Sequence, residues 1–228
     1  IYINQIKSLP NQLKKKINLD LKKIKSKKKN FSNFKFEKFP NLLGILNLTP
    51  DSFSDGGKFN SKKRAVNHAM NLMRYGTDLI DIGGESTRPG SKAISETLEW
   101  NRINKILKLL IKKKIPLSLD TRKSNIMERG INQGVRLIND VSGLNFDKKS
   151  FNLINLKKIP FVLHHMQGTP DTMQNNPKYD DALLDIFDFF EEKIHFFLKN
   201  KYKKDFIIID PGIGFGKNLE HNLRIISK

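Results

Sequence analysis

Residues 44–57 read GILNLTPDSFSDGG, a largely polar stretch that joins a short apolar run to a helical pattern. The apolar run, Leu42–Leu46, is typical of a strand that is buried on both faces. From Ser61 to Gly76, apolar residues recur at the spacing of one helix face, and the glycine marks the helix end. The connection of about ten residues exceeds the usual two to six, and long connections are more often functional or disordered. This unit therefore predicts a strand, a candidate functional loop and a helix.

The same order of buried strand, polar loop and amphipathic helix repeats along the chain. Strands are predicted at Leu42–Leu46, Leu79–Ile82, Ile115–Leu119, Arg136–Ile138, Ile159–Leu163 and Phe206–Ile209. Further helices are predicted at Ser95–Lys113, Ser124–Gln133, Lys148–Leu156 and Asp180–Asn200, and after Asn218. Strands that alternate with helices indicate a parallel sheet, because parallel neighbours need a helical crossover.

Polar residues follow every predicted strand at its C-terminal end. They are Asn47, Asp81 with Glu85, Asp120, Asn139 with Asp140, His164 with His165, and Asp210. In a (β/α)8 barrel all such ends meet on the face that holds the active site, whereas an open doubly wound sheet uses only the strands beside its switch point. The alternation alone fits both α/β folds. The strand ends favour a TIM (β/α)8 barrel, of which residues 41–228 would supply about six of the eight βα units.

The composition limits the partners and the compartment. The 228 residues include no cysteine, are 38% hydrophobic and carry a net charge of +19. Disulfides and thiolate metal sites are excluded, and a reducing compartment such as the cytoplasm is expected. No run approaches the roughly 18 to 20 apolar residues of a membrane span, and no stretch interleaves lysine with aromatic residues as a single-strand nucleic-acid platform would. We expect a solvated, lysine-rich surface with neither nucleic acid nor membrane as partner.

Residues 1–40 form a leader with twelve lysines and two acidic residues. Apolar residues recur there at helical spacing, at Leu9, Leu13, Ile17, Leu21 and Ile24. A surface helix, a membrane-surface helix and a disordered arm all fit this pattern. The phenylalanines between Phe31 and Phe39 predict a short hairpin at the bottom of the barrel.

Three of the strand-end residues, Asp120, Asn139 and Asp210, provide a carboxylate, an amide and a second carboxylate. A heterocycle with an N–C–N edge presents parallel donors that suit a carboxylate, and an amide can donate and accept at once. A pterin has such edges. The alternative is that these side chains cap helices or satisfy loop amides, as polar residues at such positions often do.

Three further motifs are weak signals when taken alone. Arg88 lies between glycines in DIGGESTRPG, where it would suit a phosphate or a carboxylate. DPGIGFGK at residues 210–217 precedes a helix, so its amides could cradle an anion, but its spacing fits neither a Walker loop nor a dinucleotide fingerprint. The adjacent His164 and His165 would point to opposite faces of a strand, which argues against a zinc site.

Six segments together resemble the bacterial dihydropteroate synthases in identity, order and spacing. They are GILNLTPDSFSDGG, DLIDIGGESTRPG, SLDT, LINDVSG, HMQGTPDTMQNNPKYDD and DPGIGFGKNLEHN, between Leu43 and Arg224. The resemblance implies a (β/α)8 barrel and a Mg²⁺-dependent transferase of folate biosynthesis, which is a sulfonamide target. It implies that p-aminobenzoate is joined to 6-hydroxymethyl-7,8-dihydropterin pyrophosphate, which gives 7,8-dihydropteroate and pyrophosphate.

The resemblance also implies roles for individual residues. By position, the residues that resemble the contacts to the pterin diphosphate are Thr87, Asp120, Asn139 and Asp210. Arg88, Pro89 and Phe215 resemble the p-aminobenzoate and sulfonamide pocket. Asn47 resembles the magnesium ligand, with Asp55 as a second ligand from the same loop. Lys217 belongs to a matching motif but receives no role.

Two departures from the family pattern affect what is expected of this sequence. His164 stands where the family usually has methionine on the wall of the pterin pocket, where it would polarise that wall or turn aside. The family's Ser-Arg-Lys segment after strand seven and Arg-x-His segment after strand eight do not occur in these 228 residues. We therefore expect a C-terminally incomplete barrel that is inactive by itself and a homodimer when complete.

Two alternatives to the synthase reaction remain open from the sequence. One is a non-catalytic remnant or pterin-binding module of the same fold. The other is a pterin-binding barrel of the methyltransferase type, which would share the Asp and Asn residues but would not carry SFSDGG and ESTRPG together.

Overall fold

The computed structural model describes residues 7–25, 30–31, 34–35, 40–49 and 58–227. The chain divides into two compact units, Ile1–Phe39 and Pro40–Lys228. In the first unit, helix α1 (Asn11–Lys25) precedes strands β1 (Asn30–Phe31) and β2 (Phe34–Lys35), which pair antiparallel. A helix, which two of the alternatives for this region include, is therefore present, and a short antiparallel pair lies within the predicted hairpin region. Phe36 and Phe39 of that predicted hairpin lie outside the described residues.

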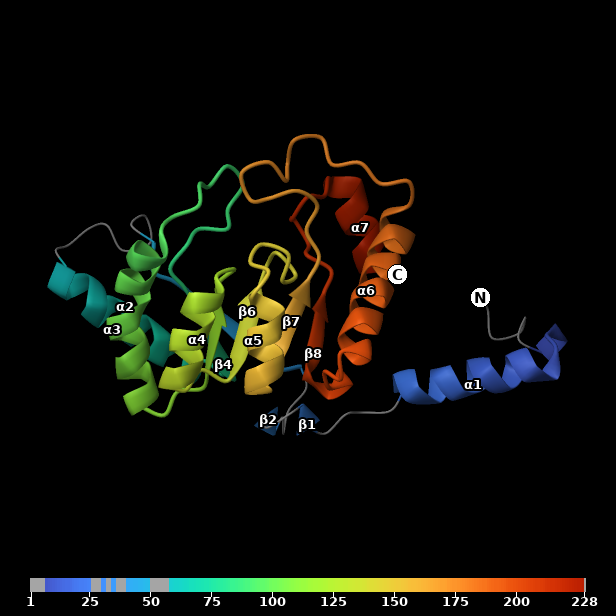
Figure 1. Ribbon diagram of the computed structural model, residues 1–228, viewed down its shortest axis with the longest axis horizontal. Helices are drawn as coiled ribbons and strands as arrows, with labels where there is room; N and C mark the ends of the chain where they lie inside the picture. The colour runs from blue at the N-terminus through green and yellow to red at the C-terminus, as the bar shows by residue number, and fades with distance from the viewer. Residues whose placement is uncertain (1–6, 26–29, 32–33, 36–39, 50–57, 228) are drawn as a thin grey trace. The chain divides into compact units, whose positions relative to one another are not determined.

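Six parallel strands form the sheet of the second unit (Figure 1). They are β3 (Leu43–Asn47), β4 (Leu79–Gly83), β5 (Leu117–Asp120), β6 (Leu137–Asp140), β7 (Phe161–His164) and β8 (Ile207–Asp210). Each strand pairs with the next one in the sequence, so the spatial order equals the chain order. A doubly wound sheet reverses its order at a switch point, whereas a barrel adds every strand on the same side. The six strands therefore have the winding of a (β/α)8 barrel.

Helices connect these strands and lie along one face of the sheet, as Figure 1 shows for α3, α4 and α5. The bounds are α2 (Lys58–Arg74), α3 (Glu96–Lys112), α4 (Ser124–Gln133), α5 (Ser150–Lys157), α6 (Ala182–Lys199) and α7 (Leu219–Ser227), with a 3₁₀ turn at Lys204–Phe206. Helix ends follow local chemistry. Ser95 Oγ accepts from the Leu98 amide at 3.2 Å, and Gly134 ends α4 in the left-handed conformation at φ 112°.

The two faces of the sheet differ in chemistry because successive strand residues point to opposite sides. On the helix face, strand side chains pack with α2–α6 in one apolar core. Its strand members include Ile80, Ile82, Leu117, Leu119, Ile138, Phe161 and Leu163. Each such side chain contributes about 1.5–3 kcal/mol when it is fully buried. The opposite face, called here the inner face, carries polar side chains toward the C-terminal strand ends.

All six predicted strands are confirmed, but they end one or two residues later than predicted. β5 and β7, for example, extend to Asp120 and His164 instead of Leu119 and Leu163. The apolar residues end where the helices stop covering the sheet. The backbone hydrogen bonds between neighbouring strands continue through the first polar residue. Five of the predicted polar residues are therefore the last residues of their strands: Asn47, Asp120, Asp140, His164 and Asp210. Asp81 and Asn139 lie inside their strands, and Glu85 and His165 lie beyond the strand ends. The predicted burial of β3 on both faces is wrong: Leu43 is 41% and Ile45 64% exposed, because this strand lies at the edge of the six-stranded sheet.

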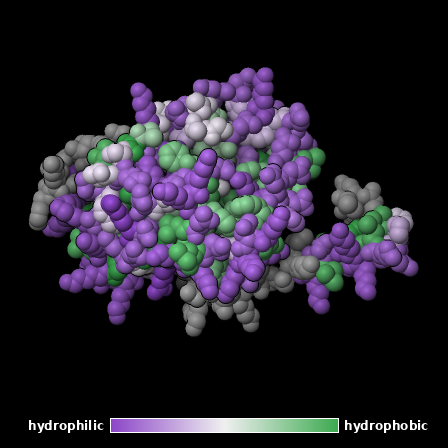
Figure 2. Space-filling model, in the orientation of Figure 1, coloured by the Kyte–Doolittle hydropathy of each residue, from purple (hydrophilic) through white to green (hydrophobic). Residues whose placement is uncertain are grey.

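Hydrophilic side chains dominate the face shown in Figure 2. Lys105, Lys108 and Lys112 of α3 are exposed, as a solvated lysine-rich surface requires. No helix in the described part of the chain is both long enough and apolar enough to span a membrane.

Candidate functional site

Four neighbouring strands bring polar groups into one row at the C-terminal edge of the inner face. Asn47 pairs with Gly83, Gly83 with Asp120, and Asp120 with Asn139. A Cβ placed on Gly83 would lie 3.3 Å from both Asn47 Oδ1 and Asp120 Oδ2. Because Gly83 has no side chain, the amide oxygen of Asn47 and the carboxylate of Asp120 both border the space above it.

Asp210 reaches the same face from two strands farther along the sheet. Asn139 pairs with Val162, and His164, two residues after Val162, pairs with Asp210. Because residues i and i+2 of a strand share a face, Asp120, Asn139 and Asp210 all lie on the inner face. One oxygen of Asp210 also accepts from the Gly212 amide at 2.8 Å, so this carboxylate fixes its own loop as well.

A fourth acidic residue, Asp81, lies below this row, and we did not include it among the predicted site residues. Asn139 Nδ2 donates to Asp81 Oδ2 at 2.8 Å. The other oxygens of this pair, Asp81 Oδ1 and Asn139 Oδ1, are buried without a hydrogen-bond partner among the described residues. Buried acceptors of this kind need donors, and a flat heterocycle with N–H groups would supply them.

Burial makes two acidic groups on this face, Asp81 and Asp120, hard to ionise. Desolvation raises the pKa of Asp81, although the nearby hydroxyl of Ser118 and the hydrogen bond from Asn139 oppose the shift. Desolvation, followed by the negative charges of Asp81 and Asp140, raises the pKa of Asp120 well above its usual value. The pair Asp81–Asp120 therefore retains a proton more readily than isolated aspartates would, and it can offer both an acceptor and an O–H donor.

Three loops meet above the strand ends, at residues 84–95, 166–181 and 211–218. The middle loop bonds to both others: the Gly90 amide donates to the Pro170 carbonyl at 2.9 Å, and Gln174 Nε2 donates to the Gly214 carbonyl at 2.6 Å. Figure 1 shows the loop after β4 reaching the loop after β7. Thr87, half-buried, and the exposed Arg88 and Pro89 lie in the first loop. Phe215 lies in the third, so the predicted p-aminobenzoate pocket has its two parts on either side of the middle loop.

The comparisons with known proteins agree with this arrangement. A profile of the family described as pterin binding enzymes matches residues 43–228. The dihydropteroate synthase of Escherichia coli K12 is 38% identical over 190 residues, which cover 83% of this chain and 67% of that enzyme. The chain belongs to the dihydropteroate synthase family.

Two solved structures of dihydropteroate synthases also match the fold. The Yersinia pestis dihydropteroate synthase with a sulfonamide drug complex has a TM-score of 0.79 at 38% identity, and the match covers 87% of this chain and 72% of that one. The Xanthomonas albilineans enzyme in complex with 7,8-dihydropteroate has a TM-score of 0.72 at 33% identity, with 82% and 66% covered. This chain thus spans about two thirds of the length of these relatives.

His164, the departure from the dihydropteroate synthase pattern, does not turn away from the inner face. Its ring meets Phe215 edge-on with centroids 4.7 Å apart, and Nδ1 lies 3.0 Å from the Val141 carbonyl. Desolvation lowers the pKa of His164, although the negative charge of Asp210 opposes the shift. A neutral imidazole therefore forms part of the wall between Asp210 and Phe215.

Lys217, to which the dihydropteroate synthase motif gave no role, is 2% exposed and holds the third loop. Its Nζ donates to the Phe215 carbonyl at 2.9 Å and lies 2.9 Å from His165 Nδ1. Desolvation lowers the pKa of Lys217 to about 8, and desolvation with the charge of Lys217 lowers the pKa of His165 to about 4. His165 faces away from His164, toward Phe189, as the strand geometry predicted.

The predicted magnesium ligands are described only in part. Asn47 is exposed at the strand edge, and its amide oxygen is a ligand type that Mg²⁺ accepts. Asp55 lies outside the described residues.

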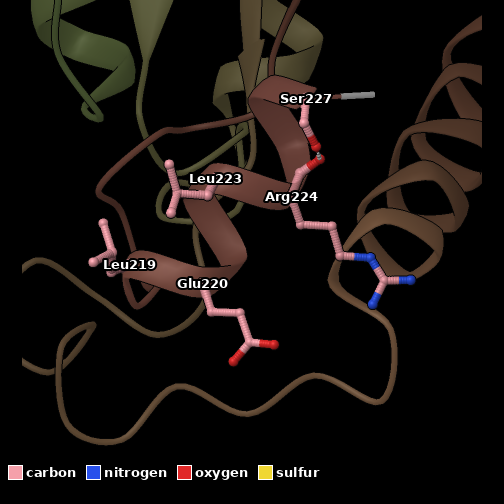
Figure 3. Close-up of a pocket in the computed structure, with 5 residues that line it drawn as sticks. All are labelled: Leu219, Glu220, Leu223, Arg224 and Ser227. Carbon is pink, nitrogen blue, oxygen red and sulfur yellow. Dashed lines mark hydrogen bonds between the residues drawn. The ribbon is translucent and has the colours of Figure 1, made fainter.

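An open hollow lies elsewhere, along α7, with Leu219 and Leu223 beside Arg224 (Figure 3). It contains none of the strand-end groups and is not a candidate for the dihydropteroate synthase site.

Proposed function

We propose that this protein condenses 6-hydroxymethyl-7,8-dihydropterin pyrophosphate with p-aminobenzoate and releases 7,8-dihydropteroate and pyrophosphate. The bond between the pterin methylene carbon and the pyrophosphate oxygen breaks, the same carbon bonds to the arylamine nitrogen, and that nitrogen loses one proton. The observation that carries the proposal is the set of Asp120, Asn139 and Asp210 at the strand ends of one face. The family membership and the 7,8-dihydropteroate bound by a relative support it.

The pterin ring would lie against the inner face. The two carboxylates, Asp120 and Asp210, would accept from N–H groups of the ring, and the unpartnered Asn139 Oδ1 would accept from another. The raised pKa of Asp120 supports this assignment, because a buried carboxylate without a donor is destabilised in its ionised form. Thr87 would contact the diphosphate from the first loop.

The p-aminobenzoate would enter between the first and third loops. Arg88 presents a fixed positive charge that suits the carboxylate of this substrate, and Pro89 and Phe215 present apolar surfaces to its ring. The hydrogen bonds of the middle loop to Gly90 and Gly214 support a common pocket. The sulfonamide complex of the Yersinia pestis relative is consistent with a pocket that also accepts sulfonamides.

Mg²⁺ is part of the proposal, with Asn47 and Asp55 as the residues that would hold it. Mg²⁺ in phosphate sites is usually held by one or two protein oxygens together with substrate phosphates, so a single exposed Asn at the strand edge fits. The ion would stabilise the negative charge that develops on the departing pyrophosphate.

The chain's own residues would then act by position and charge. The arylamine is a free base near neutral pH, so no strong general base is needed, and most of the catalysis would come from orientation and electrostatics. We also propose a cytoplasmic location, from the absence of cysteine in the sequence, and a homodimeric assembly, from the resemblance to the family.

The test is pyrophosphate release, with dihydropterin pyrophosphate as substrate, by the purified protein extended at its C-terminus with the family's last two βα units, because residues 1–228 by themselves are expected to be inactive. We expect release that requires both p-aminobenzoate and Mg²⁺, and a product that co-elutes with 7,8-dihydropteroate. Tight binding of the pterin without p-aminobenzoate-dependent release would contradict the proposed reaction and favour a binding module.

A further inference from the structure

Four charged side chains form a buried network beside the proposed site, and none of them is among the predicted site residues. The network consists of Glu85, Glu99, Arg122 and Lys123, which are 0–6% exposed. Lys123 Nζ bridges the two carboxylates, at 2.8 Å from Glu85 Oε1 and 2.6 Å from Glu99 Oε2. Arg122 donates through Nε and Nη2 to Glu85 Oε2, at 3.2 and 2.8 Å. Two positive and two negative charges balance in a region that excludes water.

Glu85 has one contact that no other member of the network has. Its Oε1 accepts from the backbone amide of Ile94 at 2.8 Å. Residues 86–93 lie between these two partners, so this carboxylate joins the two ends of the loop that carries Thr87, Arg88 and Pro89. At its tip the same loop bonds from Gly90 to Pro170. The loop is therefore fixed at its base by a side chain and at its tip by a backbone hydrogen bond.

The cations that hold Glu85 come from the turn that follows Asp120. Arg122 and Lys123 follow Asp120 by two and three residues, and Thr121 Oγ1 donates to Glu99 Oε1 at 2.5 Å. The guanidinium of Arg122 also lies 4.4 Å from the centre of the Phe146 ring. Burial would raise the pKa of Glu85, but hydrogen bonds from Lys123, Ile94 and Arg122 hold it below the usual value, so Glu85 stays ionised.

We propose that Glu85 is a positioning residue that holds the loop at residues 86–94 in place over the strand end that carries Asp120. The two substrates must approach each other from different walls: the pterin from the strand ends and p-aminobenzoate from this loop. Reacting atoms must meet within a narrow range of distance and angle, so the spacing of the two walls affects the reaction. This inference rests on the proposed function for the roles of Thr87, Arg88 and Pro89.

The variant Glu85→Gln tests this role, because it keeps the size of the side chain and removes its charge. Glu99→Gln is the matched control: Glu99 has the same burial and the same Lys123 partner, but its carboxylate touches no residue of the loop. Hydrogen exchange of the segment 86–94, read by mass spectrometry, should speed up in Glu85→Gln and not in Glu99→Gln. Exchange of residues 121–125 should rise in both variants, because both lose a partner of Lys123.

Kinetics provide the second measurement. In Glu85→Gln we expect the KM for p-aminobenzoate to rise about tenfold while the KM for the dihydropterin pyrophosphate rises much less; in Glu99→Gln both should stay within about twofold of the parent. Glu85→Asp keeps the charge but has a shorter reach, so its KM for p-aminobenzoate should lie between those of Glu85→Gln and the parent. If Glu85→Gln does not fold, Glu85→Asp replaces it in both measurements.

Equal exchange of residues 86–94 in the two Gln variants would overturn the positioning role, whether or not the protein shows turnover. An equal rise in KM for p-aminobenzoate in both variants would also overturn it, because a general loss of stability would then explain the effect. Absence of turnover in a parent that carries the family's last two βα units would overturn the proposed reaction and leave the exchange measurement to decide the role of Glu85.

Discussion

Burial raises the pKa of Asp140 to about 6, although two hydrogen bonds from Ser142 oppose the shift. The folded state therefore holds this proton to higher pH than the unfolded state does, and the resulting stabilisation is lost as the pH rises from about 4 through 6. A shift of about two units corresponds to about 3 kcal/mol at most.

We predict that the Asp140 contribution to the free energy of unfolding is lost between pH 4 and pH 6.5, so that the profile of Asp140→Asn rises relative to the parent over this range. Asn keeps the oxygen that accepts from the Ser142 amide and has no charge to bury. Urea unfolding at a series of pH values measures the effect. Parallel profiles for the parent and the variant would show that Asp140 is ionised in the folded state across this range.

Asn47 offers a test of the magnesium proposal at the level of one side chain. Because Asn47 is exposed at a strand end, Asn47→Ala should change the free energy of unfolding by no more than about 0.5 kcal/mol. It should raise the Mg²⁺ concentration needed for half-maximal pyrophosphate release. An unchanged Mg²⁺ requirement together with a large loss of stability would assign Asn47 a structural role instead.

Among the elements, α4 packs closely against the sheet at Gly130. A Cβ on Gly130 would lie 2.4 Å from Leu119 Cδ2, and Leu119 is fully buried in the apolar core. Alanine is the better helix former by about 1 kcal/mol, but overpacking a core commonly costs about 1–3 kcal/mol, so the steric term should win.

We therefore predict that Gly130→Ala lowers the free energy of unfolding by about 1–2 kcal/mol. Asn132→Ala, at an exposed position of the same helix, is the control and should shift it by no more than about 0.5 kcal/mol. Thermal and urea unfolding measure both. A higher free energy of unfolding for Gly130→Ala than for the parent would mean that Leu119 repacks freely and that α4 lies farther from the sheet than in the structure.

The sequence predicted the elements better where the signal is local. Ser95, Gly134 and Asp181 mark helix ends through their own hydrogen bonds or backbone conformation, and they can be found without knowledge of the fold. Strand ends depend on a neighbouring strand, so apolar runs placed them too early. The network around Glu85 joins residues up to 38 positions apart in the sequence, so no local pattern predicts it. Its one signal in the sequence is Glu99, a charged residue on the buried face of α3, four residues before Ile103.

For the whole molecule, alternation of strands and helices predicted a parallel sheet, and the polar strand ends favoured a barrel over an open sheet. The observed strand order confirms this choice among the described residues. The same reasoning brought Asp120, Asn139 and Asp210 together, because the C-terminal ends of all strands of a barrel meet on one face. Sequence reasoning omitted Asp81 from the site. Asp81 lies inside a strand, and only its hydrogen bond from Asn139, which the sequence does not reveal, identifies it as a neighbour of the site.

The central claim is that the pterin binds at the C-terminal ends of the strands, and the two ends of β8 allow a direct test. Asp210 ends this strand, and the exposed Asp205 lies just before its start. Asp210→Asn replaces one acceptor with a donor and should lose a charge-assisted pair worth roughly 2–4 kcal/mol, which weakens pterin binding by about thirtyfold or more.

Calorimetric titration of dihydropterin pyrophosphate into the parent, Asp210→Asn and Asp205→Asn is the measurement that decides. We predict a large loss of pterin affinity in Asp210→Asn, with p-aminobenzoate binding much less affected, and parent affinity in Asp205→Asn. Pterin affinity of Asp210→Asn within about threefold of the parent, or an equal loss in both variants, would contradict a pterin site at the strand ends.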